Sequence, residues 1–141
     1  MLFSSILLSS ISIVNFTFAE TYYDKDYNFY WGSYRDSQHS KNIGNKEDIF
    51  LVIYDSTVAT GTGEGVYIDA TATELKDPKE IKFAHHLLRT RHSVPYWKIE
   101  QVQGSTLIRL YKAKPKRVWM NTGQEVDGTY IDTRIEIGLL K

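Results

Sequence analysis

The sequence predicts a mainly β fold, an antiparallel β-barrel with one or two helices packed on it. Six or seven segments have strand-like patterns and two have helical patterns, and they do not alternate as in a doubly wound sheet. Aromatic residues make up 13% of the 141-residue chain, a richness that suits strands and also the walls around a flat ligand. A chain of this length corresponds to one domain.

The strand segments are recognised by their alternation and by their β-branched and aromatic content. Residues 27–33 (YNFYWGS) are aromatic and extended, and residues 49–55 (IFLVIYD) form a continuous apolar run that is typical of a central strand. Residues 66–75 alternate between apolar and polar side chains, as a half-buried strand does. The stretch STLIRLYKAKPKRVWMN predicts two strand pieces interrupted at Pro115, NTGQEVDGTY predicts a turn region, and residues 131–140 predict a closing strand.

Two helices are predicted between the strands. A short helix should begin at Asp36 or Ser37 and end at Gly44. A longer helix should begin at Asp77–Pro78, with Glu80 placed to bond back to the cap, and end before Pro95. Its apolar stripe recurs at helical spacing and consists of Ile81, Ala84, His85 and Leu88, broadened by Phe83 and Leu87.

Residues 1–19 carry no charged side chain and allow two interpretations. Alternation of apolar and polar residues between Ile11 and Ala19 predicts a first strand of the barrel. The apolar stretch from Leu2 to Phe18, with small residues at its end, also resembles a signal peptide. We therefore expect residues 20–141 to form the domain, which would be cytoplasmic if the first segment is a strand and secreted if it is a signal.

Composition argues against several classes of function. Seventeen basic residues balance seventeen acidic residues, so a nucleic-acid partner is not expected. The absence of cysteine excludes disulfides, thiolate nucleophiles and cysteine-ligated metals. His85, His86 and His92 lack a carboxylate at ligand spacing, so we expect no metal site. The N-terminal apolar segment is too polar and too short to predict a membrane span.

The turn after the aromatic strand contains a suggestive polar cluster. Ser37, His39, Ser40 and Lys41 stand at the start of the short helix, where backbone N–H groups, hydroxyls and a cation can hold a phosphate. The same residues also suit a solvated, capped turn. The GTGEG stretch lacks the Lys–Ser/Thr pair of a P-loop and precedes a strand, so it predicts only a flexible loop.

Two residues stand out on the C-terminal strands. Trp119 on a strand is typical of a core or dimer contact. Arg134 lies among Ile131, Ile135 and Ile137, and a guanidinium buried there requires an anionic partner.

Together these blocks resemble the pyridoxamine 5'-phosphate oxidase-like family of FMN-binding split barrels. The resemblance spans residues 22–139 and rests on the order of YDKDYNFYWGSYRDSQHSKNI, FLVIYDST, GEGVYIDATATEL, a helix begun by Asp-Pro, and YKAKPKRVWMN with YIDTRIEI. It implies a six-stranded antiparallel split β-barrel that forms a homodimer, with FMN in clefts at the dimer interface.

The resemblance also implies which residues contact the cofactor. The strand at residues 27–33 would run beside the flavin ring, and the turn that follows would hold the phosphate. The implied cofactor-binding residues are Trp31, Ser33, Ser37, His39, Ser40, Lys41, Trp119 and Arg134. The true oxidase has an Arg–Lys pair where this chain has His39–Ser40, and a substrate-binding His and Arg where it has residues 129–132. The resemblance therefore implies an FMN-dependent oxidoreductase whose small-molecule substrate it leaves open.

Two other classes of function stay open at the level of sequence. One is a non-catalytic split barrel that holds FMN, haem or a deazaflavin. The other is a secreted, lipocalin-like barrel for a small apolar ligand, although a lipocalin needs eight up-and-down strands. The absorption spectrum of the purified protein separates these classes, since a flavin band, a Soret band and a colourless protein each indicate a different one.

Overall fold

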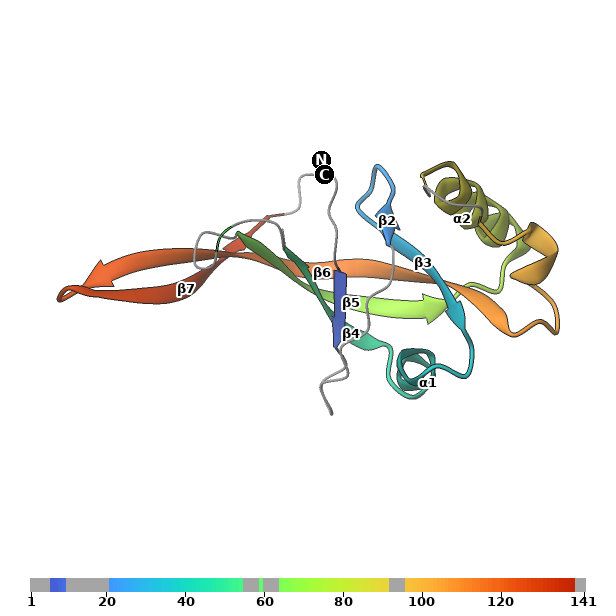
Figure 1. Ribbon diagram of the computed structural model, residues 1–141, viewed down its shortest axis with the longest axis horizontal. Coiled ribbons are helices and arrows are strands. Elements are labelled where there is room, and N and C mark those ends of the chain that lie inside the picture. Colours follow the sequence, from blue (N-terminus) through green and yellow to red (C-terminus); the bar gives the residue numbers. More distant parts are fainter. Residues whose placement is uncertain (1–5, 10–20, 55–58, 60–63, 92–95, 139–141) are drawn as a thin grey trace.

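The computed structural model describes residues 6–9, 21–54, 59, 64–91 and 96–138. Within them, seven strands form one sheet and two α-helices pack against it (Figure 1). The elements in chain order are β1 (Ile6–Ser9), β2 (Tyr22–Tyr23), β3 (Phe29–Tyr34), α1 (Gln38–Asn45), β4 (Asp48–Tyr54), β5 (Gly65–Glu74), α2 (Pro78–Arg91), a 3-10 turn (Ile99–Gln101), β6 (Ile108–Val126) and β7 (Thr129–Ile137). The predicted class, mainly β and antiparallel with two helices, is confirmed.

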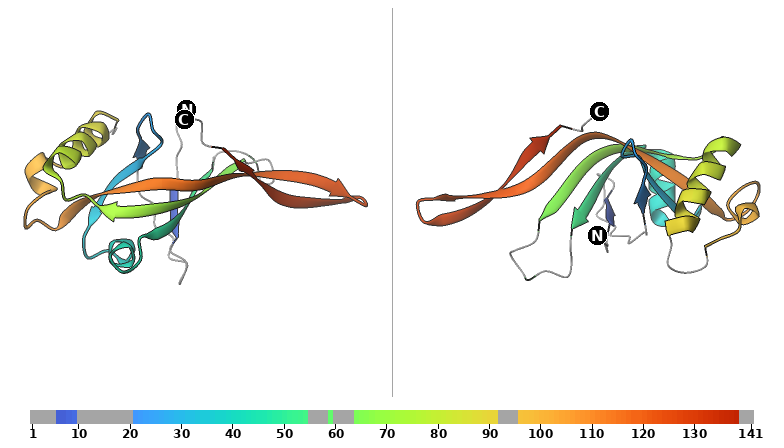
Figure 2. Two further views of the ribbon diagram at one scale, coloured as in Figure 1. Left: turned by 180° about the vertical axis from the view of Figure 1, so that it is seen from behind. Right: turned by 90° about the horizontal axis from the view of Figure 1, so that it is seen from above.

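Strand β6 organises the sheet because it pairs with three others. Six strands follow one another in the order β1-β4-β5-β6-β3-β2, and β7 pairs with the C-terminal half of β6. All of these pairs are antiparallel. The two views of Figure 2 show that the helices lie toward one end of the long strand β6 and that the β6–β7 hairpin projects from the other.

The strand break predicted at Pro115 is wrong, because β6 runs through this residue without interruption. The register of β6 against β5 shifts between Pro115 and Arg117. A β-bulge omits a ladder hydrogen bond, so a proline without an N–H is tolerated there. Lys116, at the bulge, reaches two carboxylates, Asp48 at 2.8 Å and Asp69 at 3.1 Å.

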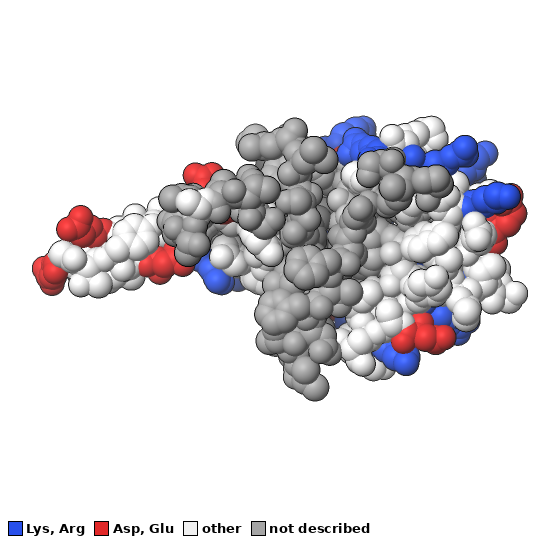
Figure 3. Space-filling view, viewed as in Figure 1, with Lys and Arg blue, Asp and Glu red and all other residues white. Residues whose placement is uncertain are grey.

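The turn region predicted at NTGQEVDGTY is wrong in extent, because most of it belongs to β6. The chain reverses at Asp127–Gly128, whose φ angles of 51° and 75° are those of a type I′ hairpin turn. Residues 121–134 therefore form a two-stranded arm that projects from the body of the sheet (Figure 1). In the space-filling view, acidic side chains gather on this arm (Figure 3).

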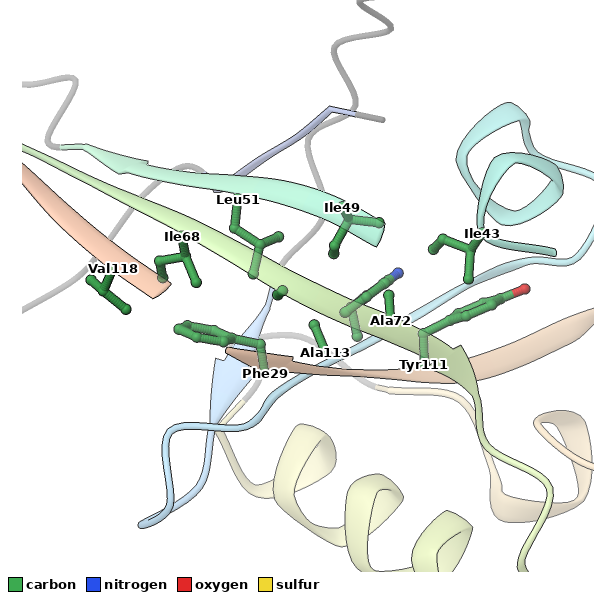
Figure 4. Close-up of a cluster of buried hydrophobic side chains, with 11 residues drawn as sticks. Phe29, Ile43, Ile49, Leu51, Ile68, Ala72, Tyr111, Ala113 and Val118 are labelled. Atoms are coloured by element: carbon green, nitrogen blue, oxygen red, sulfur yellow. The ribbon is translucent and has the colours of Figure 1, made fainter. Parts of the chain in front are cut away.

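The inward faces of β3, β4, β5 and β6 share one hydrophobic core (Figure 4). Its buried members are Phe29, Trp31, Ile43, Ile49, Leu51, Ile68, Ala70, Ala72, Tyr111, Ala113 and Val118. Trp31 is 0% exposed, and its ring stacks on Tyr111 with centroids 5.6 Å apart. Ile43 belongs to α1, so the core fixes this helix beside the turn that follows β3.

Helix α2 packs against a second hydrophobic cluster, which draws on Tyr30 of β3 and Leu110 of β6. The predicted apolar stripe is confirmed, since the buried residues of α2 are Ile81, Ala84, His85 and Leu88. Phe83, which was predicted to broaden the stripe, is half exposed and lies edge-on to Tyr30. The Asp77 carboxylate accepts a hydrogen bond from the Lys79 N–H at 2.6 Å, as a cap does.

The N-terminal strand of the sheet is β1, which pairs with β4 and places Leu8 opposite Leu51. The strand predicted at Ile11–Ala19 lies outside the described residues, as do residues 60–63 of the glycine-rich loop. None of the helices in the described part of the chain is long and apolar enough to span a bilayer.

Candidate functional site

Three serine hydroxyls and one imidazole meet at the turn between β3 and α1. The Ser37 Oγ lies 3.1 Å from the Ser33 Oγ, 2.9 Å from the Ser40 Oγ and 3.2 Å from the His39 Nε2. Because a hydroxyl donates one proton, Ser37 accepts hydrogen bonds from Ser33 and His39 when it donates to Ser40. We name these four side chains the hydroxyl turn.

Local sequence places these side chains together, because β3 ends shortly before α1 begins. Ser33 faces inward from β3, and Ser37 is the N-cap residue of α1, with an extended backbone. The Ser37 side chain makes no capping bond to the helix backbone, and the first turn of α1 contains no acidic residue. No carboxylate in the first turn of α1 therefore neutralises the positive end of the helix dipole. The N-terminus of α1 is thus suited to binding an anion.

Two cations flank the hydroxyl turn. Arg35 precedes Ser37 and Lys41 follows it, and both side chains are exposed. Neither forms an ion pair within the described part of the chain. An anion at this turn would meet a helix N-terminus and two cations, and the hydroxyls would exchange their bonds to one another for bonds to it.

Tyr111 connects the hydroxyl turn to the core. Its hydroxyl is hydrogen-bonded to the Ser40 side chain, and its ring stacks on Trp31. Burial raises the pKa of Tyr111 above its ordinary value of 10.0, although the Ser40 hydrogen bond and the charge of Arg109 act in the opposite direction. Tyr111 is therefore neutral at physiological pH and supports the turn as a packed, hydrogen-bonded ring.

We expect His39 to make stability depend on pH. Burial lowers the pKa of His39 below its ordinary value of 6.5. As pH falls, the unfolded chain takes up this proton first, so stability present above pH 6.5 is lost as pH falls through the folded-state pKa. Between about pH 8 and about pH 5, the free energy of unfolding measured with urea should fall less steeply with decreasing pH in His39→Gln than in the wild type. Equal slopes in the two proteins would contradict this assignment.

A second group of residues lies on the outer face of β4, β5 and β6. Phe50 packs against Trp119 with ring centroids 6.0 Å apart and against Tyr67 at 6.5 Å. We name these three rings the aromatic platform. They face outward because they alternate with core residues on their strands, and all three are half-buried. The Arg117 guanidinium lies 4.7 Å from the centre of the Trp119 ring.

Arg134 belongs to this outer group and is not buried among the isoleucines around it. Alternation along β7 puts Ile131, Ile135 and Ile137 on one face and Arg134 on the other. The exposed Arg134 guanidinium lies 3.9 Å from the centre of the Tyr67 ring, a cation–π contact. It makes no ion pair with the described residues, whereas Arg117 pairs with Glu136 at 2.7 Å and lowers the pKa of that carboxyl.

The hydroxyl turn and the aromatic platform are far apart within one chain. Tyr111 contacts the turn and Trp119 belongs to the platform, and they are eight residues apart on β6. At about 3.3 Å per residue this separation is roughly 25 Å, more than the length of an FMN molecule. The two rings also lie on opposite faces of the sheet, since Tyr111 belongs to the core. One chain therefore brings together Ser33, Ser37, His39 and Ser40, but not Trp119 or Arg134.

Trp31 lies beneath the hydroxyl turn rather than on a surface. Its side chain is fully buried, and its Nε1 has no hydrogen-bond partner among the described residues. His85 is also structural, because its Nε2–H donates to the Trp97 carbonyl at 2.6 Å. In the described part of the chain, no three His, Asp or Glu side chains gather in a way that could hold a metal ion.

Sequence reasoning did not single out four residues of these two groups, which are Phe50, Tyr67, Tyr111 and Arg117. Phe50 and Tyr67 stand in alternating or apolar strand segments, where a single ring carries no distinguishing signal. Tyr111 meets Ser40 only because β3 and β6 are paired. The Arg117–Trp119 spacing of two residues, which places both side chains on one face of a strand, is the one signal that was available.

Comparison with known proteins bears on the fold. The sequence matches no family model and no curated protein. HutZ from Vibrio cholerae, a haem storage protein, superposes with a TM-score of 0.68 and 14% identity, covering 82% of this chain and 84% of that one. A Listeria innocua protein described as a candidate pyridoxamine 5'-phosphate oxidase gives a TM-score of 0.57 and 11% identity, covering 82% and 86%. The fold is a split barrel of the pyridoxamine 5'-phosphate oxidase-like kind.

A third structure shows the same fold in a longer protein. A haem-binding protein from Mycobacterium smegmatis gives a TM-score of 0.63 and 11% identity, covering 93% of this chain and 53% of that one. The split barrel therefore occurs in proteins whose names point to different chemistry, haem storage or binding in two of them and pyridoxamine 5'-phosphate oxidation in the third. Because a fold does not determine chemistry, the cofactor of this chain has to be argued from its own residues.

Proposed function

We propose that this chain binds FMN by its phosphate at the hydroxyl turn and acts as an FMN-dependent oxidoreductase on a small molecule. The observation that carries the proposal is the convergence of Ser33, Ser37 and Ser40 at the N-terminus of α1, between two exposed cations. An FMN phosphate carries nearly two negative charges, and a formally neutral chain has to offset them locally.

The residues present fit the rest of FMN only if two chains contribute. The aromatic platform offers three half-buried rings, with the Arg117 guanidinium over Trp119 and the Arg134 guanidinium over Tyr67, which suits an anionic group. It lies roughly 25 Å along β6 from the hydroxyl turn of the same chain. The proposal therefore includes a homodimer in which the turn of one copy and the platform of the other face a shared cleft.

When bound, FMN supplies hydride and electron transfer, and the chain supplies binding and electrostatics. The hydroxyl turn would orient the phosphate end of the cofactor. Arg134 would place positive charge at the platform, near the ring of a bound flavin. An anion at the turn would also raise the pKa of His39, against the effect of burial.

We expect Lys41→Ala to weaken FMN binding by about one to two powers of ten, because a charge-assisted contact contributes about 1.5–3 kcal/mol. Riboflavin lacks the phosphate, so its affinity should change by less than about twofold. Titrating both flavins into the full chain, with flavin fluorescence as the signal, measures the two affinities.

Lys46→Ala is the matched control, since Lys46 is an exposed lysine at the opposite end of α1. It should leave both affinities unchanged. Unchanged FMN binding in Lys41→Ala, or an equal loss of riboflavin binding, would show that the turn is a capped surface loop and not a phosphate site.

Haem is the second candidate cofactor, because HutZ and the Mycobacterium smegmatis protein of the same fold are named for haem. Its carboxylates could use the same donors at the hydroxyl turn. Absorption spectra after separate incubation with FMN and with haem distinguish the two, since a Soret band that persists through gel filtration would favour haem over FMN.

A further inference from the structure

An ion pair lies on the inner face of the sheet, at the end where the hydroxyl turn lies. The Arg109 Nε of β6 is 3.2 Å from a carboxylate oxygen of Glu74 on β5. The Arg109 side chain is 11% exposed and the Glu74 side chain is 37% exposed. Among the ion pairs of the described residues, this one holds the most deeply buried cation. Burying a charge is costly, so a guanidinium in this position has to be compensated by nearby anions.

Strand register places this ion pair beside the hydroxyl turn. Arg109 lies opposite Ser33 in the β3–β6 ladder, and Glu74 lies opposite Tyr111 in the β5–β6 ladder. Residues opposite each other in an antiparallel ladder point to the same face, with their Cβ atoms about 5 Å apart. Ser33 belongs to the hydroxyl turn, and Tyr111 is hydrogen-bonded to its Ser40. The turn therefore has a cation beneath one side and a carboxylate beneath the other.

The charges of the pair act on the side chain that supports the turn. Burial is the main cause that raises the pKa of Tyr111, and the charge of Glu74 raises it further, whereas the charges of Arg109 and Arg35 lower it. A charge that acts on the Tyr111 hydroxyl also acts on Ser40, because the two side chains are in contact. Arg35 is one of the two exposed cations that flank the turn, so Arg109 adds a buried cation on the side facing the sheet.

The other hydrogen bonds of Arg109 hold the guanidinium in place. Its Nη1 donates to the Thr106 hydroxyl at 3.1 Å and to the Ile108 carbonyl at 2.8 Å, and its Nη2 donates to the Gly104 carbonyl at 2.7 Å. These acceptors are neutral, so they fix the group without cancelling its charge. Within the described part of the chain, Glu74 is the one carboxylate that pairs with Arg109, and it is partly in water. Positive potential therefore remains on the Ser33 side of the turn.

We infer that Arg109 is a third cation of the phosphate site, acting from beneath the hydroxyl turn, and that Glu74 limits the strength of that site. The inference rests on the proposed function for the identity of the ligand, a phosphate monoester. Arg109 acts through its charge on an anion held by the serines, without touching it. The two members of the pair then have opposite effects. Losing the Arg109 charge weakens phosphate binding, and losing the Glu74 charge strengthens it.

The first test titrates FMN and riboflavin into the full chain carrying Glu74→Gln or Arg109→Gln. Glu74→Gln should bind FMN about threefold more tightly than the wild type, and Arg109→Gln about tenfold more weakly. Riboflavin has no phosphate, so its affinity should change by less than about twofold in either variant. If the pair only holds the fold together, both substitutions loosen the turn and both weaken FMN binding, which would overturn the inference.

Glu80→Gln and Lys112→Gln are the matched controls. These two residues form an ion pair at 3.1 Å that joins α2 to the opposite face of β6, and neither substitution should change FMN affinity. Arg109→Lys keeps the charge but not the fork of donors, so it should retain most of the preference for FMN over riboflavin. Should Arg109→Gln fail to fold, Glu74→Gln decides alone, since the loss of a merely structural ion pair does not tighten FMN binding.

The second test uses inorganic phosphate, which probes the site without a flavin. Its titration into isotope-labelled protein should shift the backbone amide signals of residues 38–40, in the first turn of α1, and Glu74→Gln should lower its Kd about threefold.

The two tests separate this inference from the proposed function. A preference for FMN that Lys41→Ala abolishes, but that both variants of the pair leave unchanged, would overturn the inference alone. Phosphate binding that Glu74→Gln strengthens, in a protein that does not bind FMN, would support the inference and overturn the proposed function. Unchanged amide signals in phosphate, together with no binding of FMN, would overturn both.

Discussion

Trp31→Ala should destabilise the domain by about 3–5 kcal/mol, the cost of emptying a large aromatic site in a core. Trp31 is fully buried, stacks on Tyr111 and stands among the inward residues of four strands. A domain of this size is stable by about 5–15 kcal/mol, so the variant would keep only part of its stability. Thermal unfolding followed by circular dichroism should show a fall in Tm of roughly 10–20 °C.

Trp31→Phe is the informative control for this site. The indole Nε1 has no hydrogen-bond partner among the described residues, so its removal costs no hydrogen bond. Phenylalanine retains a ring that can stack on Tyr111, and we expect a loss of about 1–2 kcal/mol from the smaller volume. A loss as large as that of Trp31→Ala would contradict this expectation, because it would mean that a smaller ring does not restore the packing against Tyr111.

The two tryptophans show which part of the site could be predicted from sequence. Trp31 and Trp119 both stand on strands, and the resemblance assigned both to the cofactor. The structure puts Trp31 in the core and Trp119 on the outer face. Alternation predicts which residues share a face of a strand. Which of the two faces is turned toward the core depends on the neighbouring strands with which it pairs.

The hydroxyl turn, by contrast, was accessible from sequence because its members are close neighbours. Ser37, His39 and Ser40 lie within one helical turn, and the cap position fixes their direction. Their support by Tyr111 is a contact between residues 71 positions apart in the chain. Such contacts follow from strand pairing, which local patterns do not specify.

The fold, too, could be predicted where it depends on local sequence pattern, but not where it depends on strand pairing. The stripe of α2 was predicted residue by residue, because a 3.6-residue period fixes which side chains share a face. The passage of β6 through Pro115 and the length of the arm were missed. Local rules predict that proline interrupts a strand and that a polar stretch forms a turn. In both cases pairing with a neighbouring strand keeps the segment extended.

Leu88→Ala should cost about 2–5 kcal/mol, which makes it the second of the large effects on stability. Leu88 is fully buried between α2 and the sheet, in the cluster that contains Tyr30 and Leu110. Truncation leaves a cavity at a contact between two rigid elements, where neither the helix nor β6 can move without breaking its own hydrogen bonds. Urea unfolding should show a lower midpoint with an unchanged m-value.

Leu87→Ala removes the same atoms one residue earlier and is the matched control. Leu87 is only half-buried at the margin of this cluster, so the loss should be about 1 kcal/mol or less. Equal losses in the two variants would show that the helix contributes through its own propensity and not through the packing of one face. Because α2 packs away from the hydroxyl turn, neither variant should change the ratio of FMN to riboflavin affinity while the protein is folded, which separates the stability of the barrel from recognition of the phosphate.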